Sequence, residues 1–256
     1  MATITRGGFL KQLDTLLRGE RTTLDALRGG IIDIPARIFV PAAIGLGCIY
    51  GFFMGWYAVS AASHPGAWMQ LVASTVKLPA LFLLTLLVTF PSLYVFNALV
   101  GCRLGFTAAL RLLVAAVVVN LAVGASLGPI LAFFTLSSTS YTFIVLLNVA
   151  LLAVAGFVSL GFLLRTLQRI EAVAVAEAVE RAEASGVPRV LTEAQSGAAN
   201  GIFKIWVVIY ALVGAQMGWL LRPFIGNPNM PFAWFRPREG NFFQSVFTHL
   251  QHFMGF

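Results

Sequence analysis

The sequence predicts an all-α polytopic membrane protein: a bundle of five transmembrane helices with amphipathic interfacial segments at both ends. Hydrophobic residues make up 59% of the 256 residues and charged residues only 11%, whereas about a quarter of a soluble domain is charged. Several uncharged stretches also reach the roughly 20 residues that a spanning helix needs. A chain with so little charge cannot cover a water-facing surface, which excludes the soluble globular and the disordered classes.

Residues 1–37 are predicted to be a cytoplasmic amphipathic segment. They mix basic and acidic side chains and lack an apolar core followed by a small-residue cleavage site, so we expect no cleaved signal peptide. Residues 9–31 carry apolar side chains at helical spacing, with charges between them: Leu10, Leu13, Leu17, Leu24, Leu27 and Ile31. Such a helix either lies on the membrane surface or packs against a partner or against residues 166–200.

Residues 38–164 form the predicted four-helix membrane region. Pro65 and Gly66 end the first helix, and Pro79 is expected in the first turn of the second, where its missing N–H loses no partner. The following uncharged interval is 53 residues long, which suits two spans joined at the polar turn 137–140. The four helices are expected at Ile38–Val59, Leu78–Val100, 112–135 and 141–164.

The last third of the chain divides into three further segments. Residues 165–201 are rich in helix formers and should continue the fourth helix into the cytoplasm until Gly186 and Pro188 end it. A fifth transmembrane helix is predicted at 202–221, where Trp206, Tyr210 and Trp219 are interpreted as an interfacial aromatic belt. Residues 222–256, rich in proline and aromatic residues, are expected to lie against the outer membrane surface or the bundle, with a short interfacial helix over 241–256.

The distribution of basic residues predicts the orientation. With the N-terminus inside, thirteen of the seventeen Lys and Arg residues fall on the inner side of the five predicted helices. The positive-inside rule therefore favours a cytoplasmic N-terminus and a periplasmic C-terminus in a bacterial inner membrane. The net charge of +7 is then explained by cytoplasmic segments and anionic lipid head groups, since no nucleic-acid-binding motif is present.

A ladder of small residues marks the first predicted helix. Ala43, Gly47, Gly51 and Gly55 recur at four-residue spacing and form a flat ridge that lets another backbone approach closely. The pattern predicts a helix-packing interface, either within the chain or between subunits. Gly214 and Gly218 form a weaker pair of the same kind in the fifth helix, and the third helix is expected to kink at Gly124, Gly128 and Pro129.

Two asparagines form the candidate intramembrane polar site. Asn120 and Asn148 lie at comparable depth on neighbouring predicted helices, so they either bond to each other or line a polar path. No ionisable residue falls near the middle of a predicted span, which argues against ion-coupled transport. A channel for a small neutral solute, lined by Asn97, Asn120 and Asn148, remains the alternative.

No pattern in the sequence indicates catalysis, a metal or a cofactor. His249 and His252 share one helical face, but no carboxylate or thiol lies near them to complete a metal site. Cys48 and Cys102 are interpreted as small apolar space-fillers. No catalytic motif is present, and no span carries a central histidine to ligate a haem. We therefore expect a protein that is not an enzyme.

Two stretches resemble a family of poorly characterised bacterial polytopic membrane proteins: Lys77–Gly101 and Arg222–Gly226 with Phe242 and Phe243. Residues 70–165 also resemble the five-helix Yip-domain membrane proteins, mainly through the turn Gly101–Arg111. The resemblance to the Yip family implies five spans and a non-enzymatic role exerted through partners in membrane trafficking. It supplies no catalytic residues.

Together these features predict a non-catalytic membrane subunit or scaffold. It would assemble with itself or with partner proteins, as a homo-oligomer or part of a larger membrane complex, through the glycine face of the first helix and its surface helices. Its other expected partners are membrane lipids, including anionic head groups, and not nucleic acid.

Overall fold

The structure is a computed structural model that describes residues 6–20, 23, 36–61, 66–99, 106–185, 190–222, 224–227, 230–235 and 240–254. Within these residues every regular element is helical. The helices are α1 (Arg6–Leu17), α3 (Ala36–Ser60), α4 (Ala67–Leu99), α5 (Phe106–Ser137), α6 (Tyr141–Ser185), α7 (Val190–Leu221) and α8 (Phe242–Met254). The predicted all-α bundle is confirmed.

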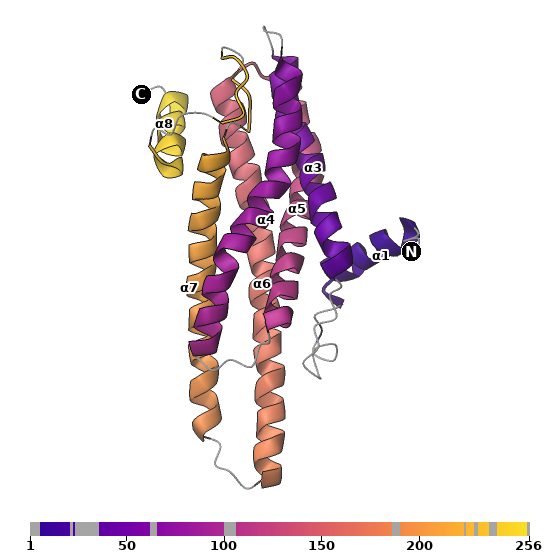
Figure 1. Cartoon of the computed structure of the whole chain (residues 1–256), viewed down its shortest axis with the longest axis vertical. Helices are drawn as coiled ribbons and strands as arrows, with labels where there is room; N and C mark the ends of the chain where they lie inside the picture. Colours follow the sequence, from indigo (N-terminus) through magenta and orange to yellow (C-terminus); the bar gives the residue numbers. More distant parts are fainter. Residues whose placement is uncertain are drawn as a thin grey trace.

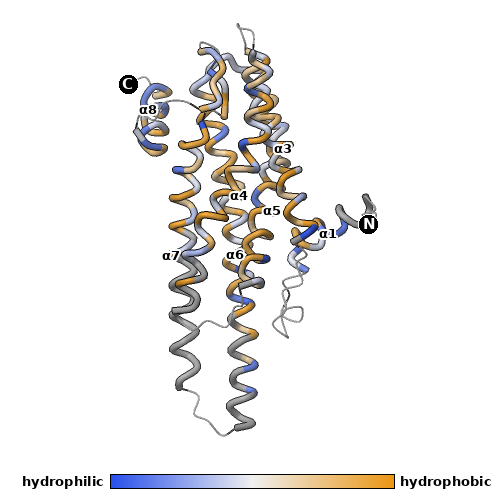
Figure 2. The backbone as a smooth tube through the Cα atoms, in the orientation of Figure 1, coloured by the Kyte–Doolittle hydropathy of each residue, from blue (hydrophilic) through white to orange (hydrophobic). Residues whose placement is uncertain are grey.

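Four segments of the described chain are long and apolar enough to cross a membrane: Arg37–Ser60, Ala67–Ser92, Thr107–Ser137 and Tyr141–Ile170. The fifth predicted helix lies in α7, which contributes the shorter apolar stretch Val208–Leu221. In Figure 2 apolar residues predominate along the coloured parts of α3 to α7, whereas polar residues appear on α1 and on the coloured part of α6 below its apolar stretch. These helices confirm a multi-pass, membrane-embedded protein.

The helices α3 to α7 run alternately up and down along the bundle axis (Figure 1). The end of α3, the start of α4 and the α5–α6 connection therefore lie at the upper end, and the end of α4 and the start of α5 lie toward the lower end. Helix α3 packs against α4 and α5, α5 packs against α6, and α4 packs against α7. Helices α6 and α7 follow each other in the chain yet contact each other far less than these pairs do.

The second predicted helix begins earlier than expected. Helix α4 starts at Ala67, directly after Gly66, whose φ of 105° is accessible to glycine. Pro79 therefore lies inside the helix and not in its first turn, so that prediction was wrong. The Pro79 ring packs closely on Gly47 of α3, and such neighbouring helices are what allows proline inside membrane helices.

Helix α1 is shorter than the amphipathic helix predicted over residues 9–31. It ends at Leu17, because Gly19 takes a left-handed conformation with a φ of 72°. Its last turn carries an exposed ion pair of 2.9 Å between Arg18 and Asp14, which raises the pKa of Arg18 through a hydrogen bond and the carboxylate charge. Leu16 is fully buried in the hydrophobic core, so α1 packs against the bundle. Leu24, Leu27 and Ile31 lie outside the described residues.

Helix α6 continues beyond the apolar region, as residues 165–201 predict. It has 45 residues and is therefore about 68 Å long, more than twice the thickness of a bilayer core of about 30 Å. Together with the first turns of α7 it extends past the lower ends of α4 and α5 (Figure 1). Gly186 and Pro188, which were expected to end the helix, lie outside the described part of the chain.

The segment after α7 folds back over the upper end of the bundle. The Phe224 carbonyl accepts hydrogen bonds from Gln70 Nε2, at 3.0 Å, and from the Ser74 hydroxyl. Further along, the Trp234 carbonyl accepts one from Lys77 Nζ, which also lies 4.9 Å from the centre of the Phe235 ring. These contacts join the C-terminal segment to α4 at two places, so it lies against the bundle.

Gly226 of this C-terminal segment lies in close contact with Ala58 of α3 and Gln70 of α4. An added Cβ would lie 2.8 Å from Ala58 Cβ and 2.8 Å from Gln70 Cγ. We expect Gly226→Val to cost about 1–3 kcal/mol of the docking free energy and to expose the segment. Chymotrypsin cleavage after Trp234 and Phe235 should then become at least about fivefold faster. Exposed Met230 provides the matched control, because Met230→Val should leave the cleavage rate unchanged. Equal rates for both variants would contradict the docking.

Candidate ligand cavity

The predicted glycine face joins α3 to α4 within the chain. Ala43 is fully buried. A Cβ added at Gly47 would lie 2.8 Å from Pro79 Cβ, one at Gly51 2.6 Å from the Ser74 carbonyl oxygen, and one at Gly55 2.7 Å from Leu71 Cα. The helices therefore meet backbone to backbone along this face. Because α4 covers it, the face cannot also hold another subunit, and the expectation that the protein assembles through it was wrong.

The glycines of α5 serve the same kind of contact on the other side of α3. A Cβ at Gly128 would lie 2.3 Å from Phe53 Cδ2, and one at Gly124 would lie 3.8 Å from the Tyr50 ring. Two aromatic rings of α3 thus rest on glycines of α5. The sequence suggested only a kink at these positions, because nothing in α5 alone shows which side chains of another helix will face it.

The two candidate asparagines are not bonded to each other. Asn148 Oδ1 accepts a buried hydrogen bond of 2.9 Å from the Tyr50 hydroxyl, which joins α6 to α3. Asn120 Oδ1 is buried and has no hydrogen-bond partner. Both residues line one cavity, whereas the side chain of Asn97 lies outside the described part of the structure. The proposed pair is therefore one structural hydrogen bond and one unsatisfied acceptor.

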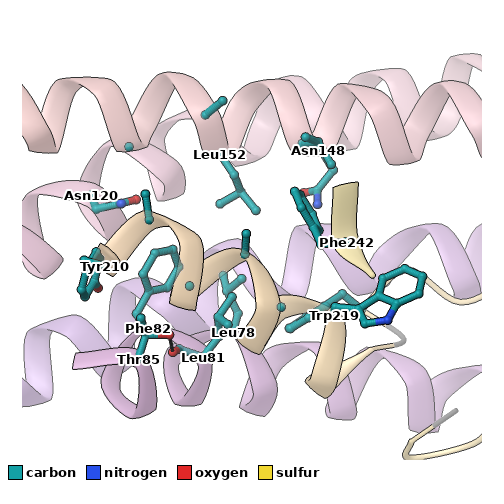
Figure 3. Close-up of a pocket in the computed structure, with 18 of the residues that line it drawn as sticks. Leu78, Leu81, Phe82, Thr85, Asn120, Asn148, Leu152, Tyr210, Trp219 and Phe242 are labelled. Atoms are coloured by element: carbon teal, nitrogen blue, oxygen red, sulfur yellow. Dashed lines mark hydrogen bonds between the residues drawn. The ribbon is translucent and has the colours of Figure 1, made fainter. Parts of the chain in front are cut away.

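The cavity has a volume of about 650 Å³ and lies between α4, α5, α6 and α7. Phe224 and Ile225 of the C-terminal segment and Phe242, Val246 and His249 of α8 close its upper end. Figure 3 shows Leu78, Leu81 and Leu152 projecting into it, and its walls are mainly apolar. It occupies a space between α6 and α7, which contact each other less than the neighbouring helix pairs do.

Small residues on both helices keep this space open. Gly156 of α6 and Gly214 and Gly218 of α7 all line the cavity. A Cβ at Gly156 or Gly218 would meet no atom within 4 Å, and one at Gly214 would meet only Thr85 Cγ2, at 3.5 Å. The interpretation of Gly214 and Gly218 as a helix-contact pair therefore fits Gly214, which lies at contact distance from Thr85 of α4, but was wrong for Gly218. Gly156 and Gly218 face empty space, which can accommodate a larger side chain or a ligand.

Most polar groups around the cavity are already satisfied within the protein. The Thr85 hydroxyl donates to the Leu81 carbonyl at 2.7 Å, and the Ser159 hydroxyl donates to the Ala116 carbonyl at 2.7 Å. By contrast, Asn120 Oδ1 and the Tyr210 hydroxyl are buried and lack any hydrogen-bond partner. Figure 3 shows both residues at the same end of the cavity, away from Asn148, Trp219 and Phe242. This end is a candidate for recognition of a polar group.

The opposite end of the cavity lies beneath α8. The Arg222 guanidinium stacks 3.6 Å from the centre of the Trp219 ring, and the Trp219 Nε1–H donates to the Gly240 carbonyl at 3.0 Å. His249 Nδ1 lies 2.8 Å from the Ser245 carbonyl, and its ring faces Tyr141. Among the described residues no three His, Cys, Asp or Glu side chains are grouped as metal ligands. The contacts of His249 are thus those of a packed side chain.

The aromatic residues of α7 do not form the predicted interfacial belt at its lower end. Trp206 is 1% exposed and its Nε1–H donates to the Thr89 carbonyl at 3.1 Å. The Tyr210 ring packs beside it, with ring centres 5.4 Å apart. The spacing of these residues could have predicted that they share a face. Cavity-lining residues recur at every fourth position along one face of α7 and continue just past its end, at Trp206, Tyr210, Gly214, Gly218 and Arg222.

Comparison with known proteins adds no relative to this picture: no protein-family model, curated protein or solved structure matches the chain. The resemblance to Yip-domain proteins stays a prediction. The function of the cavity is therefore inferred from its own geometry and from the unsatisfied polar atoms Asn120 Oδ1 and the Tyr210 hydroxyl.

Proposed function

We propose that this protein is a non-catalytic multi-pass membrane protein that binds an elongated, mainly apolar molecule from the bilayer in the cavity between α4, α5, α6 and α7. The observation that carries the proposal is the pair of glycines at Gly156 and Gly218, which line a space instead of a helix contact. Packed membrane helices use such residues to approach closely. Here they leave room for another molecule.

The dimensions and the lining of the cavity favour a lipid-like ligand. Its volume falls within the range of about 300–1,000 Å³ that is typical of ligand sites. The lining face of α7 runs from Trp206 to Arg222, a rise of about 24 Å, so the site is long. A hydrated polar solute would lose its water against mainly apolar walls, whereas a lipid or isoprenoid chain would not.

A channel for a small neutral solute is the second candidate. The unsatisfied Asn120 oxygen favours it, because a polar path needs free hydrogen-bonding groups. Asn148 gives it less support, since its oxygen is bonded to Tyr50. Uptake of glycerol or urea by proteoliposomes tests this candidate directly, and flux that is lost in Asn120→Leu would favour it over lipid binding.

We further propose that the protein resides in a bacterial inner membrane with the N-terminal segment and the α6–α7 extension in the cytoplasm. The bias of thirteen of seventeen basic residues supports this orientation, and so does the position of the C-terminal segment at the opposite end of the bundle from the start of α3. Assembly with itself or with partners would use surfaces other than the covered glycine face. A periplasm-sensitive reporter fused after Phe256 should be active, and a reporter active only in the cytoplasm would reverse the orientation.

Filling the cavity tests the proposed function. We expect the protein, purified in mild detergent or reconstituted with mixed phospholipids and isoprenoids, to retain a stoichiometric apolar molecule that native mass spectrometry detects. The double variant Gly156→Leu/Gly218→Leu should fold normally, because no atom lies within 4 Å of either added Cβ. It should lose at least about 90% of the bound molecule, since the leucines occupy its volume.

The control for this experiment is Gly45→Leu. Gly45 of α3 also has no atom within 4 Å of an added Cβ, but it is exposed and lies outside the cavity. This variant should retain the bound molecule at the wild-type level. A wild-type protein that carries no bound molecule, or a filled cavity that retains it, would refute the proposed function.

A further inference from the structure

We infer that the ligand of this cavity is a neutral amphiphile that carries a hydroxyl group, and that the hydroxyl binds between Asn120 and Tyr210. The inference rests on the proposed function and adds the chemical class and the orientation of the ligand. Long-chain alcohols, isoprenoid alcohols and quinols share this chemistry. Three features of the site lead to it: the two unsatisfied atoms, the absence of charge around them, and their depth in the bundle.

The hydrogen-bonding capacity of the two side chains identifies the group they would recognise. Asn120 Oδ1 and the Tyr210 hydroxyl come from different helices, α5 and α7, and both are buried without a partner. Buried polar atoms in folded proteins nearly always have a partner. An amide oxygen only accepts, whereas a phenol both donates and accepts. A ligand hydroxyl can donate to Asn120 and accept from Tyr210, but a ketone or ester oxygen would leave Asn120 unsatisfied.

The surroundings of these atoms exclude a charged group. Among the described residues of the cavity, Phe82, Thr85 and Trp206 lie at this end, and none of them is ionisable. Trp206 and Thr85 already use their own polar hydrogens within the protein. A phosphate or carboxylate placed here would be buried without a counter-charge, which is strongly unfavourable. The bound group must therefore be neutral.

The depth of the site determines how the ligand lies. Tyr210 is eleven residues before the end of α7 at Leu221, or about 16 Å along the helix axis. That distance is about half of a bilayer core of about 30 Å. The hydroxyl is thus held near the middle of the bundle, and the apolar part extends along the face of α7 that Gly214 and Gly218 leave open. A phospholipid with its head group at the membrane surface would bring only acyl-chain carbons to this depth, and these cannot satisfy the two polar atoms.

A matched pair of probes tests the inference: radiolabelled 1-hexadecanol and its methyl ether, which keeps the oxygen but lacks the donor. Binding to the reconstituted protein is measured relative to partitioning into protein-free bilayers. We expect the wild-type protein to bind the alcohol at least about tenfold more tightly than the ether, because only the alcohol can donate to Asn120 Oδ1. The Gly156→Leu/Gly218→Leu variant should bind neither probe.

Single substitutions assign the preference to the two side chains. Asn120→Leu should bind the ether as the wild type does, which shows that the cavity is intact, but should reduce the preference for the alcohol to less than about twofold. Tyr210→Phe should weaken alcohol binding about fivefold. Ser126→Ala is the control, because this α5 hydroxyl is exposed, bonds to the Val123 carbonyl and lies outside the cavity.

Two outcomes would overturn the inference. Equal wild-type binding of the alcohol and the ether, with both probes excluded by the filled cavity, would leave the proposed function standing and show that the two atoms recognise no hydroxyl. An undiminished preference in Asn120→Leu would mean that a buried water satisfies these atoms. Failure of every apolar probe to bind would instead contradict the proposed function itself.

Discussion

Gly51→Val is expected to destabilise the folded bundle strongly. The first added carbon would lie 2.6 Å from the Ser74 carbonyl oxygen and 2.8 Å from Thr75 Cα. Both are backbone atoms of α4, so no side-chain rotation relieves the clash and the two helices must separate. Overpacking in a core typically costs about 1–3 kcal/mol, and we expect more than about 3 kcal/mol here because α3 contacts both α4 and α5. Unfolding in mixed micelles, followed by circular dichroism, measures the loss.

The matched control for this prediction is Gly45→Val in the same helix. It adds the same isopropyl side chain and the same change in helix propensity, but a Cβ at Gly45 meets no atom within 4 Å. Its unfolding free energy should stay within about 0.5 kcal/mol of the wild type. If both variants unfold at the same denaturant concentration, the close contact between α3 and α4 is not what holds these helices together.

Gly51 also illustrates how much of the fold the sequence determines. The uncharged intervals located α3 to α6 because a spanning helix must be long and apolar, a requirement that each segment meets independently of its neighbours. The boundaries were less predictable. Pro79 indicated a helix start, yet it lies inside α4, where its ring packs on Gly47. That contact exists only in the assembled bundle, so the sequence of α4 alone does not reveal it.

The cavity was harder to predict for the same reason. Gly47 with Gly51 and Gly214 with Gly218 have the same spacing, but both members of the first pair touch α4, whereas Gly218 of the second pair faces an empty space. The four-residue spacing of glycines shows that one face of the helix is flat, but it does not show whether another helix packs against that face. The burial of Trp206 depends likewise on α4, whose Thr89 carbonyl accepts its hydrogen bond, whereas an aromatic residue in an apolar helix resembles an interfacial one in the sequence.

The buried hydrogen bond between the Tyr50 hydroxyl and Asn148 Oδ1 decides whether Asn148 stabilises the bundle or lines a path for a solute. Tyr50 is fully buried and Asn148 is 7% exposed. Their 2.9 Å hydrogen bond joins α3 to α6, and the two residues are 98 positions apart in the chain. Tyr50→Phe leaves the Asn148 oxygen without its donor, and Asn148→Leu leaves the Tyr50 hydroxyl without its acceptor. Each should destabilise the bundle by about 1–3 kcal/mol, the cost of a buried unsatisfied group.

The double variant Tyr50→Phe/Asn148→Leu should lose less stability than the sum of the two single losses, because it removes both polar groups together. We expect a coupling free energy of about 0.6–1.7 kcal/mol, the range measured for hydrogen bonds between membrane helices. Pairing Tyr50→Phe with Ser126→Ala, whose hydroxyl is exposed and bonded within its own helix, should give additive losses. A coupled result assigns Asn148 to the structure of the bundle. Strict additivity, combined with solute flux that depends on Asn148, would instead favour a path through the cavity and weaken the case for a bound lipid.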